Sequence, residues 1–413
     1  MSAAAIAVAG LVALAVAMGI GRFAFTPILP MMLHDGVVDL HAASWLASAN
    51  YIGYLIGALG CTLQPRIWAR LPQLPPVDAS LLVRSGLVGT ALLTLAMAVP
   101  SPALWPTLRF AAGIASSLVF VYSSGWCLAQ LAVRGRPALG GVMFAGPGAG
   151  IVASGLIASA MVMWHMTSAE AWLVFGVMAA LLTASVWRGF APSAVRDRSP
   201  AAAGAAAAAP SPVPGATGTP HGSVEVATLA FAYGISGFGY IVTATFLPVI
   251  ARASLPPASP WLDLFWPIFG AGVIVGALLA TRVRIGGDLR FVIASCYVLQ
   301  AIAIGVGIGV PTAAGFALGS FLLGLPFTAI TFFALQEVRH LRPLQIASTT
   351  GLLTVLWSIG QAAGPPMVAL LLHRGGTVDA AFTLALTIAA AALVGGALVF
   401  LASARIWPKA SAC

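Results

Sequence analysis

The chain has 413 residues, of which 60% are hydrophobic and only 7% are charged, and its formal net charge is +9. Soluble globular proteins carry about 25% charged residues, so a chain this poor in charge cannot cover a water-facing surface, and a soluble globular fold is excluded. The basic residues lie in short clusters between apolar runs. This arrangement favours membrane topology, and not nucleic-acid binding, as the reason for the positive charge.

Apolar runs long enough to cross a bilayer follow one another along the chain. A transmembrane helix needs about 20 mostly apolar residues. The sequence predicts twelve such helices, at residues 3–33, 44–63, 79–99, 103–131, 137–161, 168–188, 223–250, 261–280, 290–309, 311–335, 345–371 and 379–403. We therefore expect an all-α membrane protein with twelve transmembrane helices.

A low-complexity segment separates the first six predicted helices from the last six. It contains the stretch SPAAAGAAAAAPSPVPGATGTPHGS, whose Ala, Pro and Gly residues cannot bury a core. We expect an N-terminal six-helix bundle at 1–188, a cytoplasmic Ala/Pro/Gly-rich linker at 189–222, and a C-terminal six-helix bundle with a short tail at 223–413.

The distribution of Lys and Arg predicts the orientation of the chain. With the N-terminus in the cytoplasm, 15 of the 19 basic residues fall on the cytoplasmic side. Only Arg252 and Arg374 fall outside, while Arg22 and Arg109 lie within helices. The positive-inside rule therefore predicts a multi-pass protein with both termini in the cytoplasm.

The two halves repeat one another at a constant offset of 218 residues. The matched pairs, first half to second, are Gly19 and Gly237, Leu29 and Leu247, Pro30 and Pro248, Gly146 and Gly364, and Pro147 and Pro365. Separate marks that share one offset indicate a parallel duplication of six helices. Such repeats are typical of transporters whose substrate site lies near the bilayer midplane between the halves.

Several motifs resemble those of a known superfamily and family. The GPxxG run at Gly146 and the pair Arg109-x3-Gly113 resemble motifs of the fifth and fourth helices of the major facilitator superfamily. The stretches GIGRFAFTPILP, ANYIGYLIGAL, RFAAGIASSLVF and GFGYIVTATFLP are similar to the YbfB/YjiJ family of bacterial permeases. The superfamily's loop signature GxxxDRxGR reads GCTLQPRIWAR from Gly60 to Arg70, without its aspartate.

The resemblance has consequences for fold and location. It implies a major facilitator fold of two parallel six-helix repeats in a bacterial inner membrane. It also implies a transporter and not an enzyme, with no settled substrate.

Arg22 lies in the apolar centre of the first predicted helix. An arginine at the centre of a membrane helix costs about 2.5–3.5 kcal/mol, so we expect it to face a cavity or a partner. One interpretation is a counter-charge for an anionic substrate, because the guanidinium fork suits a carboxylate. The other is a structural arginine bonded to carbonyls at helix breaks near Pro27 and Pro30. We prefer the first.

Arg109 begins a stripe on the fourth helix that continues through Gly113, Ser116, Phe120 and Ser123. The superfamily resemblance suggests a role in proton coupling for Arg109. A small-residue packing face with a snorkelling arginine explains the same pattern, and both interpretations stay open.

Polar residues of three further helices complete the candidate site. Tyr240 is the repeat partner of Arg22 and shares a face with Thr243, which we expect to line a cavity, the alternative being ordinary interhelical hydrogen bonding. Gln361 either fills hydrogen bonds opened by the prolines that follow it, which we prefer, or faces the substrate. The expected cavity residues are Arg22, Thr26, Asn50, Tyr54, Arg109, Ser116, Tyr240, Thr243 and Gln361.

Glycines and prolines mark expected sites of helix bending or gating. Proline removes a backbone donor and disturbs the preceding turn of a helix. The expected bending residues are Pro27, Pro30, Gly146, Pro147, Pro248, Gly364 and Pro365.

Acidic residues are absent from the centres of the predicted helices. Asp35, Glu225 and Glu337 lie near helix ends, where we expect interfacial charges, although Asp35 or Glu225 could carry a coupled proton. Two buried arginines without a deep carboxylate favour an organic anion as substrate. The four cysteines are far apart, so neither a metal site nor a disulfide framework is indicated.

We expect a secondary transporter that moves a small organic solute, with an organic anion favoured, by alternating access. It should need no cofactor or metal, bind no nucleic acid, lie in the lipid bilayer and work as a monomer, with proton coupling left open. One alternative is a drug or sugar efflux antiporter. An alternative of another class is a non-transporting membrane sensor or scaffold, which would usually add a soluble domain.

Overall fold

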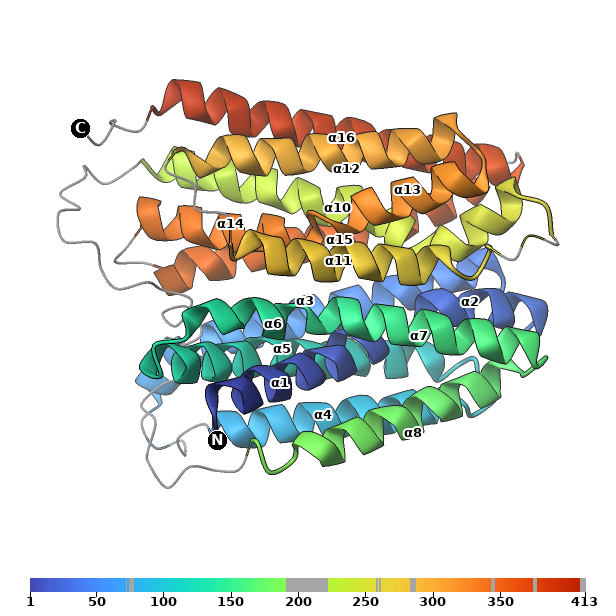
Figure 1. Cartoon of the computed structure of the whole chain (residues 1–413), viewed down its shortest axis with the longest axis horizontal. Helices are drawn as coiled ribbons and strands as arrows, with labels where there is room; N and C mark the ends of the chain where they lie inside the picture. The colour runs from blue at the N-terminus through green and yellow to red at the C-terminus, as the bar shows by residue number, and fades with distance from the viewer. Residues whose placement is uncertain are drawn as a thin grey trace.

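The computed structural model describes residues 1–71, 73, 78–190, 222–257, 259, 261–282, 287–342, 346–373 and 377–408, and its regular elements are all helices. Figure 1 shows them running side by side along the long axis, with the helices of the first half below those of the second. Both ends of the chain lie toward the left of this view. We call this the terminal end of the molecule and the other the opposite end.

The described part of the first half contains ten helical segments. They are α1 (Ala3–Leu14), the π-helix η1 (Ala15–Ile20), α2 (Phe25–His34), α3 (Leu40–Arg70), α4 (Ala79–Ala96), α5 (Trp105–Val133), the 3-10 turn η2 (Pro137–Leu139), α6 (Gly140–Phe144), α7 (Gly146–Met163) and α8 (Ser168–Val186).

The described part of the second half contains seven. They are α10 (Ser223–Ser254), α11 (Phe265–Ala280), α12 (Leu289–Gly309), α13 (Ala313–Gly324), α14 (Phe327–Leu341), α15 (Ile346–His373) and α16 (Val378–Ile406).

These segments form the twelve predicted helices. Within the described residues, eleven spans are long and apolar enough to cross a membrane, and the shorter apolar Phe265–Ala280 is the twelfth helix. Three predicted helices are composites: the first joins α1, η1 and α2, the fifth joins η2, α6 and α7, and the tenth joins α13 and α14. The predicted linker, 189–222, lies almost wholly outside the described residues.

Prolines act differently in the two halves. In the first helix, Pro27 lacks the N–H that would bond the carbonyl of Phe23, and the regular helix is lost in the turn just before it. We expected breaks near Pro27 and Pro30; the disruption lies upstream, in η1 and the turn after it, while both prolines belong to α2. The helices α10 and α15 continue unbroken through Pro248 and Pro365.

The halves meet where α3 packs on α15, where α6 and α7 pack on α11, and where α2 packs on α10. Within the first half, the break in the first helix packs closely against the fifth. A side chain at Gly19 in η1 would overlap the backbone of Gly150 in α7, so both positions need glycine. The disrupted segment is therefore held directly against a neighbouring backbone.

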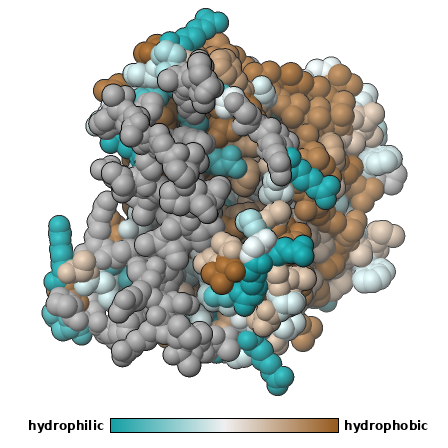
Figure 2. All heavy atoms as spheres, turned by 60° about the vertical axis from the view of Figure 1, so that its left-hand side comes forward, coloured by the Kyte–Doolittle hydropathy of each residue, from teal (hydrophilic) through white to brown (hydrophobic). Residues whose placement is uncertain are grey.

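The terminal end carries most of the polar surface in the view of Figure 2, while the flank that recedes from it is mainly hydrophobic. Each half also closes this end with an arginine. Arg84 in α4 donates to the carbonyl of Trp187 at 2.8 Å, and Arg290 in α12 donates to the carbonyl of Trp407 at 2.7 Å. Each half therefore has a hydrogen bond from an arginine that joins its third helix to the end of its last.

Candidate functional site

Arg22 lies in the turn between η1 and α2, near the middle of the first helix, and is 1% exposed. The turn exists because a π-helix precedes it and Pro27 follows it. Single-turn π-segments occur frequently at functional sites, because they change the direction in which side chains point. Here they place a guanidinium at the contact between the two halves.

Arg109 holds the backbone of this turn. Its Nη1 donates to the carbonyl of Gly21 and its Nη2 to that of Arg22, each at 3.2 Å. Ser116, on the same stripe of α5, donates to the carbonyl of Ala17 in η1 at 2.8 Å. Asn50 donates to the carbonyl of Arg109 at 2.9 Å. The role of a structural arginine bonded to carbonyls is therefore filled by Arg109 and not by Arg22, and Arg109 is 2% exposed and does not snorkel.

The Arg22 guanidinium takes part in a hydrogen-bond chain that crosses between the halves. Its Nη2 donates to Oε1 of Gln361 in α15, and Nε2 of Gln361 donates to the hydroxyl of Tyr240 in α10. We expected Gln361 to fill the hydrogen bonds opened by the prolines after it. Its side chain bonds Arg22 and Tyr240 instead. Among the described residues, the Nε and Nη1 of Arg22 have no hydrogen-bond partner.

Four aromatic rings surround the same guanidinium. Its Cζ lies 4.2 Å from the ring centroid of Tyr54, 4.9 Å from Tyr51, 5.4 Å from Phe23 and 5.7 Å from Trp357. We call these four residues the Arg22 cage. Cation–π contacts at these distances partly offset the cost of burying the charge.

Two hydroxyl groups near the cage also join the halves. Thr26 donates to the carbonyl of Ala244 at 2.9 Å, and the hydroxyls of Tyr51 and Thr245 lie 2.9 Å apart. The carbonyl of Ala244 is free because Pro248, four residues on, has no N–H. A proline of one half thus creates the acceptor that the other half uses.

Thr243 is the expected site residue that lies elsewhere. It lines a separate pocket inside the second half with Ser320, of about 30 Å³, between α10, α12, α13 and α16. Ala244, four residues after Tyr240, lies closer to the direction of Tyr240 on α10 than Thr243 does, because four residues along an α-helix return nearer to the same face than three.

Three members of the cage were not expected from the sequence. Tyr51 lies one turn before Tyr54, and Phe23 is adjacent to Arg22. Trp357 lies four residues before Gln361, so both side chains occupy one face of α15. The i, i+4 spacing of Trp357 and Gln361 is the sequence pattern that indicates Trp357 as a site residue.

The expected bending residues lie at packing contacts as well as at prolines. Gly146 and Pro147 begin α7 at its junction with α6. A side chain at Gly146 would overlap the carbonyl of Leu11, and one at Gly364 would overlap Ile241. The small residues thus let the helices of the first, fifth, seventh and eleventh spans approach closely.

A second buried group of polar residues lies at the terminal end of the second half. Arg290 is fully buried and donates to Glu225 at 3.1 Å and to Asp288 at 2.7 Å, and lies 3.8 Å from Glu337. Glu225 and Glu337 are therefore buried and ion-paired at this end of the second half.

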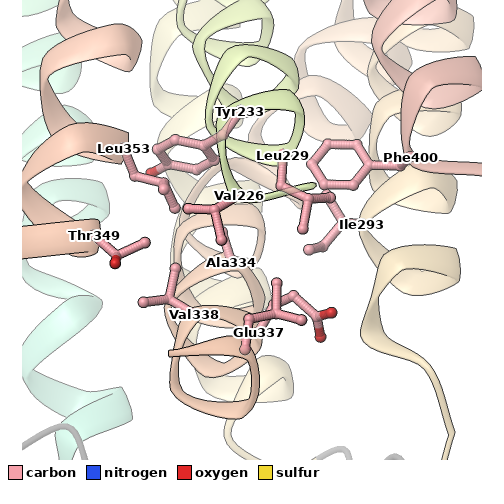
Figure 3. A pocket seen from close by; sticks show the side chains of 11 residues that line it. Val226, Leu229, Tyr233, Ile293, Ala334, Glu337, Val338, Thr349, Leu353 and Phe400 are labelled. Carbon is pink, nitrogen blue, oxygen red and sulfur yellow. The ribbon is translucent and has the colours of Figure 1, made fainter. Parts of the chain in front are cut away.

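Glu337 also lines a small pocket with Tyr233 and Thr349, shown in Figure 3. Its volume of about 20 Å³ has room for about one water molecule. An organic solute does not fit there.

Comparison with known proteins agrees with this architecture. A family model described as "Uncharacterised MFS-type transporter YbfB" matches residues 14–401. The fold is similar to the crystal structure of a mutant of the nucleoside transporter NupG, with a TM-score of 0.68 and 14% identity over 96% of this chain and 99% of that chain. At this identity the likeness concerns the fold alone, and it confirms the predicted major facilitator arrangement. No curated protein matches the sequence.

Proposed function

The chain belongs to the family of YbfB-type transporters of the major facilitator superfamily, and from this premise we propose that it carries a small organic anion by alternating access. Membership makes it a multi-pass membrane transporter of a small molecule and not an enzyme. In the proposal, Arg22 binds the negative charge of the substrate.

The observation that supports the proposal is the state of the Arg22 guanidinium. It is buried where the halves meet, and among the described residues no Asp or Glu forms an ion pair with it. A buried charge without a counter-ion is costly, so an incoming carboxylate would find a favourable partner. Nε and Nη1 are unused, and either of them can pair with the remaining N–H of Nη2 to meet the two oxygens of a carboxylate.

The position of the site supports alternating access. Gln361 and Tyr240 reach Arg22 from the second half, and the bonds of Thr26 and Tyr51 cross the same contact. Rocking the two halves apart at either end would open a path to Arg22 from that side.

The proposed topology follows the distribution of basic residues. We place the terminal end in the cytoplasm of a bacterium and the opposite end outside the inner membrane. The proposed units are residues 1–188 and 223–413, joined by the linker at 189–222.

A sugar or nucleoside substrate is less well supported than an anion. NupG, whose fold this chain resembles, is a nucleoside transporter. Neutral, hydroxyl-rich solutes need several uncommitted polar side chains to bind them. At this site Thr26 and Tyr51 are engaged with protein partners, and Asn50 donates to a backbone carbonyl, so that only its Oδ1 is left without a partner among the described residues. A cationic drug would need a carboxylate, whereas the charge beside the cage is positive.

The test uses purified full-length protein and three probes: sodium lactate, sodium benzoate and tetraethylammonium chloride. We expect one or both anions, and not the cation, to raise the melting temperature and to be taken up by proteoliposomes. Arg22→Ala should abolish both effects. The matched control is Arg134→Ala, because Arg134 is exposed and bonds its own neighbour Gln130. Stabilisation by tetraethylammonium alone, or normal anion uptake by Arg22→Ala, would contradict the proposal.

A further inference from the structure

We infer that the substrate class is aromatic monocarboxylates: the carboxylate binds Arg22 and the ring binds among the aromatic side chains around it. The inference rests on the proposed function of Arg22 as the anion-binding group. It adds the shape and chemistry of the rest of the substrate.

First, the Arg22 guanidinium is surrounded by aromatic rings. These rings form the Arg22 cage, with three from the first half and Trp357 from the second. A carboxylate that reaches either unused donor, Nε or Nη1, must carry its substituent into this surface. The substituent therefore meets ring faces and edges, and not a wall of polar groups.

The second step is the extent of the aromatic surface. Tyr240 lies nearly parallel to Trp357, with centroids 6.0 Å apart and an interplanar angle of 21°, and meets Phe327 edge-on at 4.8 Å. Phe23 meets Trp266 edge-on at 6.0 Å. Rings of both halves thus form one continuous layer around Arg22. Aromatic groups gain affinity from such offset and edge contacts beyond what their area alone provides.

The third step is the number of charges. Arg109 is the other arginine nearby, but its Nη1 and Nη2 are engaged with the carbonyls of Gly21 and Arg22. Within the described part of the chain, its only unused donor is the single Nε. Arg22 therefore offers the one guanidinium fork at this site, which matches one carboxylate, and a dicarboxylate would bring a second charge into a layer of rings without a second fork to bind it.

The fourth step is the polarity of the body. Thr26 and Tyr51 direct their hydroxyls to partners in the other half, and Asn50 donates to a backbone carbonyl, which leaves its Oδ1 as a single unpartnered acceptor among the residues described. A hydroxyl-rich substrate would lose its hydration without regaining hydrogen bonds, which weakens binding. A flat apolar ring loses nothing in this way.

The experiment compares four probes by calorimetric titration of the full-length protein. Benzoate has the ring and the charge. Cyclohexanecarboxylate has the charge and a similar size but no π-system, phthalate has the ring and two charges, and benzamide has the ring without charge. We expect benzoate to bind about 3- to 10-fold more tightly than cyclohexanecarboxylate, the gain typical of aromatic pairing. Phthalate and benzamide should bind more weakly than either.

Variants of the cage test whether the rings cause the preference. Trp357→Leu should remove most of the difference between benzoate and cyclohexanecarboxylate, while Trp357→Phe should keep it. The matched control is Trp164→Leu, because Trp164 is 73% exposed and follows α7 at the opposite end. If Trp357→Leu does not fold, Tyr54→Leu against Tyr54→Phe gives the same comparison.

The outcomes separate this inference from the proposed function. Equal affinity for benzoate and cyclohexanecarboxylate, both lost in Arg22→Ala, would overturn the aromatic class and leave anion transport standing. The same holds if the benzoate preference survives both Trp357→Leu and Tyr54→Leu. If no probe binds in a way that depends on Arg22, both proposals fail.

Discussion

Arg22 and Arg109 have separate roles, which follow from the groups that each guanidinium contacts. The donors of Arg109 are directed at two backbone carbonyls that the π-helix and its following turn leave without helical partners. The guanidinium of Arg22 meets an amide and four ring faces instead. One arginine stabilises the backbone, and the other presents its charge at the meeting of the halves.

This difference predicts opposite effects on stability for one kind of substitution. Arg109→Met should lower the free energy of unfolding by about 1–3 kcal/mol for each carbonyl left without a donor. Arg22→Met removes a buried charge with unused donors, so its melting temperature should equal or exceed that of the natural protein. Tryptophan fluorescence during heating in detergent measures both. An equal loss of stability in the two variants would show that Arg22 is structural as well.

For single residues, the sequence predicts which side chains belong to the candidate site. It does not predict which groups those side chains contact. Arg22, Tyr240 and Gln361 were all expected at the site, because polar groups in apolar helices need a reason to be there. Their hydrogen-bond chain could not be predicted, since it joins residues of three helices from the two halves. Nor could the carbonyl-binding task be given to Arg109, because the π-helix that exposes those carbonyls has no clear sequence signal.

At the scale of elements, the duplicated halves explain why the first helix breaks and the seventh does not. Pro30 and Pro248 occupy equivalent positions, and α10 stays continuous through Pro248. Pro27 has Thr245 as its equivalent, 218 residues later, and a threonine keeps its N–H. The additional proline of the first helix accounts for the turn that carries Arg22.

Replacing Pro27 by its repeat equivalent should therefore straighten the first helix. In Pro27→Thr the new N–H can bond the carbonyl of Phe23, and the protein should stay folded. Arg22 should move away from Gln361 and the cage. A charge-assisted hydrogen bond contributes about 1.5–3 kcal/mol, so benzoate affinity should fall about 10- to 100-fold. Calorimetric titration measures this, and Pro30→Ala is the control; unchanged affinity in Pro27→Thr would contradict the explanation.

Helix number and approximate bounds follow from hydrophobic length, and all twelve predicted helices are present. The interruptions are harder to predict, since a proline disturbs the turn before it and the outcome depends on which groups satisfy the freed carbonyls. The hydroxyl of Thr26 does so for Ala244, and α10 is unbroken.

On the scale of the whole molecule, the two halves differ in how firmly their terminal ends are tied. In the first half, the half-buried Arg84 bonds one carbonyl and packs on the Trp187 ring at 4.6 Å. In the second, Arg290 has three carboxylates within 4 Å and is also bonded to the carbonyls of Ser403 and Trp407. A single arginine thus links α10, α12, α14 and the end of α16. From the sequence, Arg290 was one of the basic residues that fall on the cytoplasmic side, and its ion pairs were not expected.

The tie in the second half should be much the stronger. Removing one member of a buried ion pair typically costs about 3–5 kcal/mol, so Arg290→Gln should markedly lower the melting temperature in detergent. Arg84→Gln should cost less than about 1 kcal/mol, as for partly exposed charges. Equal losses would show that burial of the Arg290 cluster adds nothing to stability.

The hydrogen bond between Thr26 and Ala244 joins equivalent positions of the duplicated halves. These positions are 218 residues apart, so they are the same position in the two copies of the repeat. Equivalent points of a two-fold arrangement can touch only at its axis, which therefore passes beside them. Arg22 and Tyr240 are equivalent too, and share the amide of Gln361. A homodimer of identical six-helix chains could present charges about such an axis only in pairs, and two arginines there would repel each other. Joining the copies into one chain allows an arginine, Arg22, on one side of the axis and a phenol, Tyr240, at the equivalent position on the other.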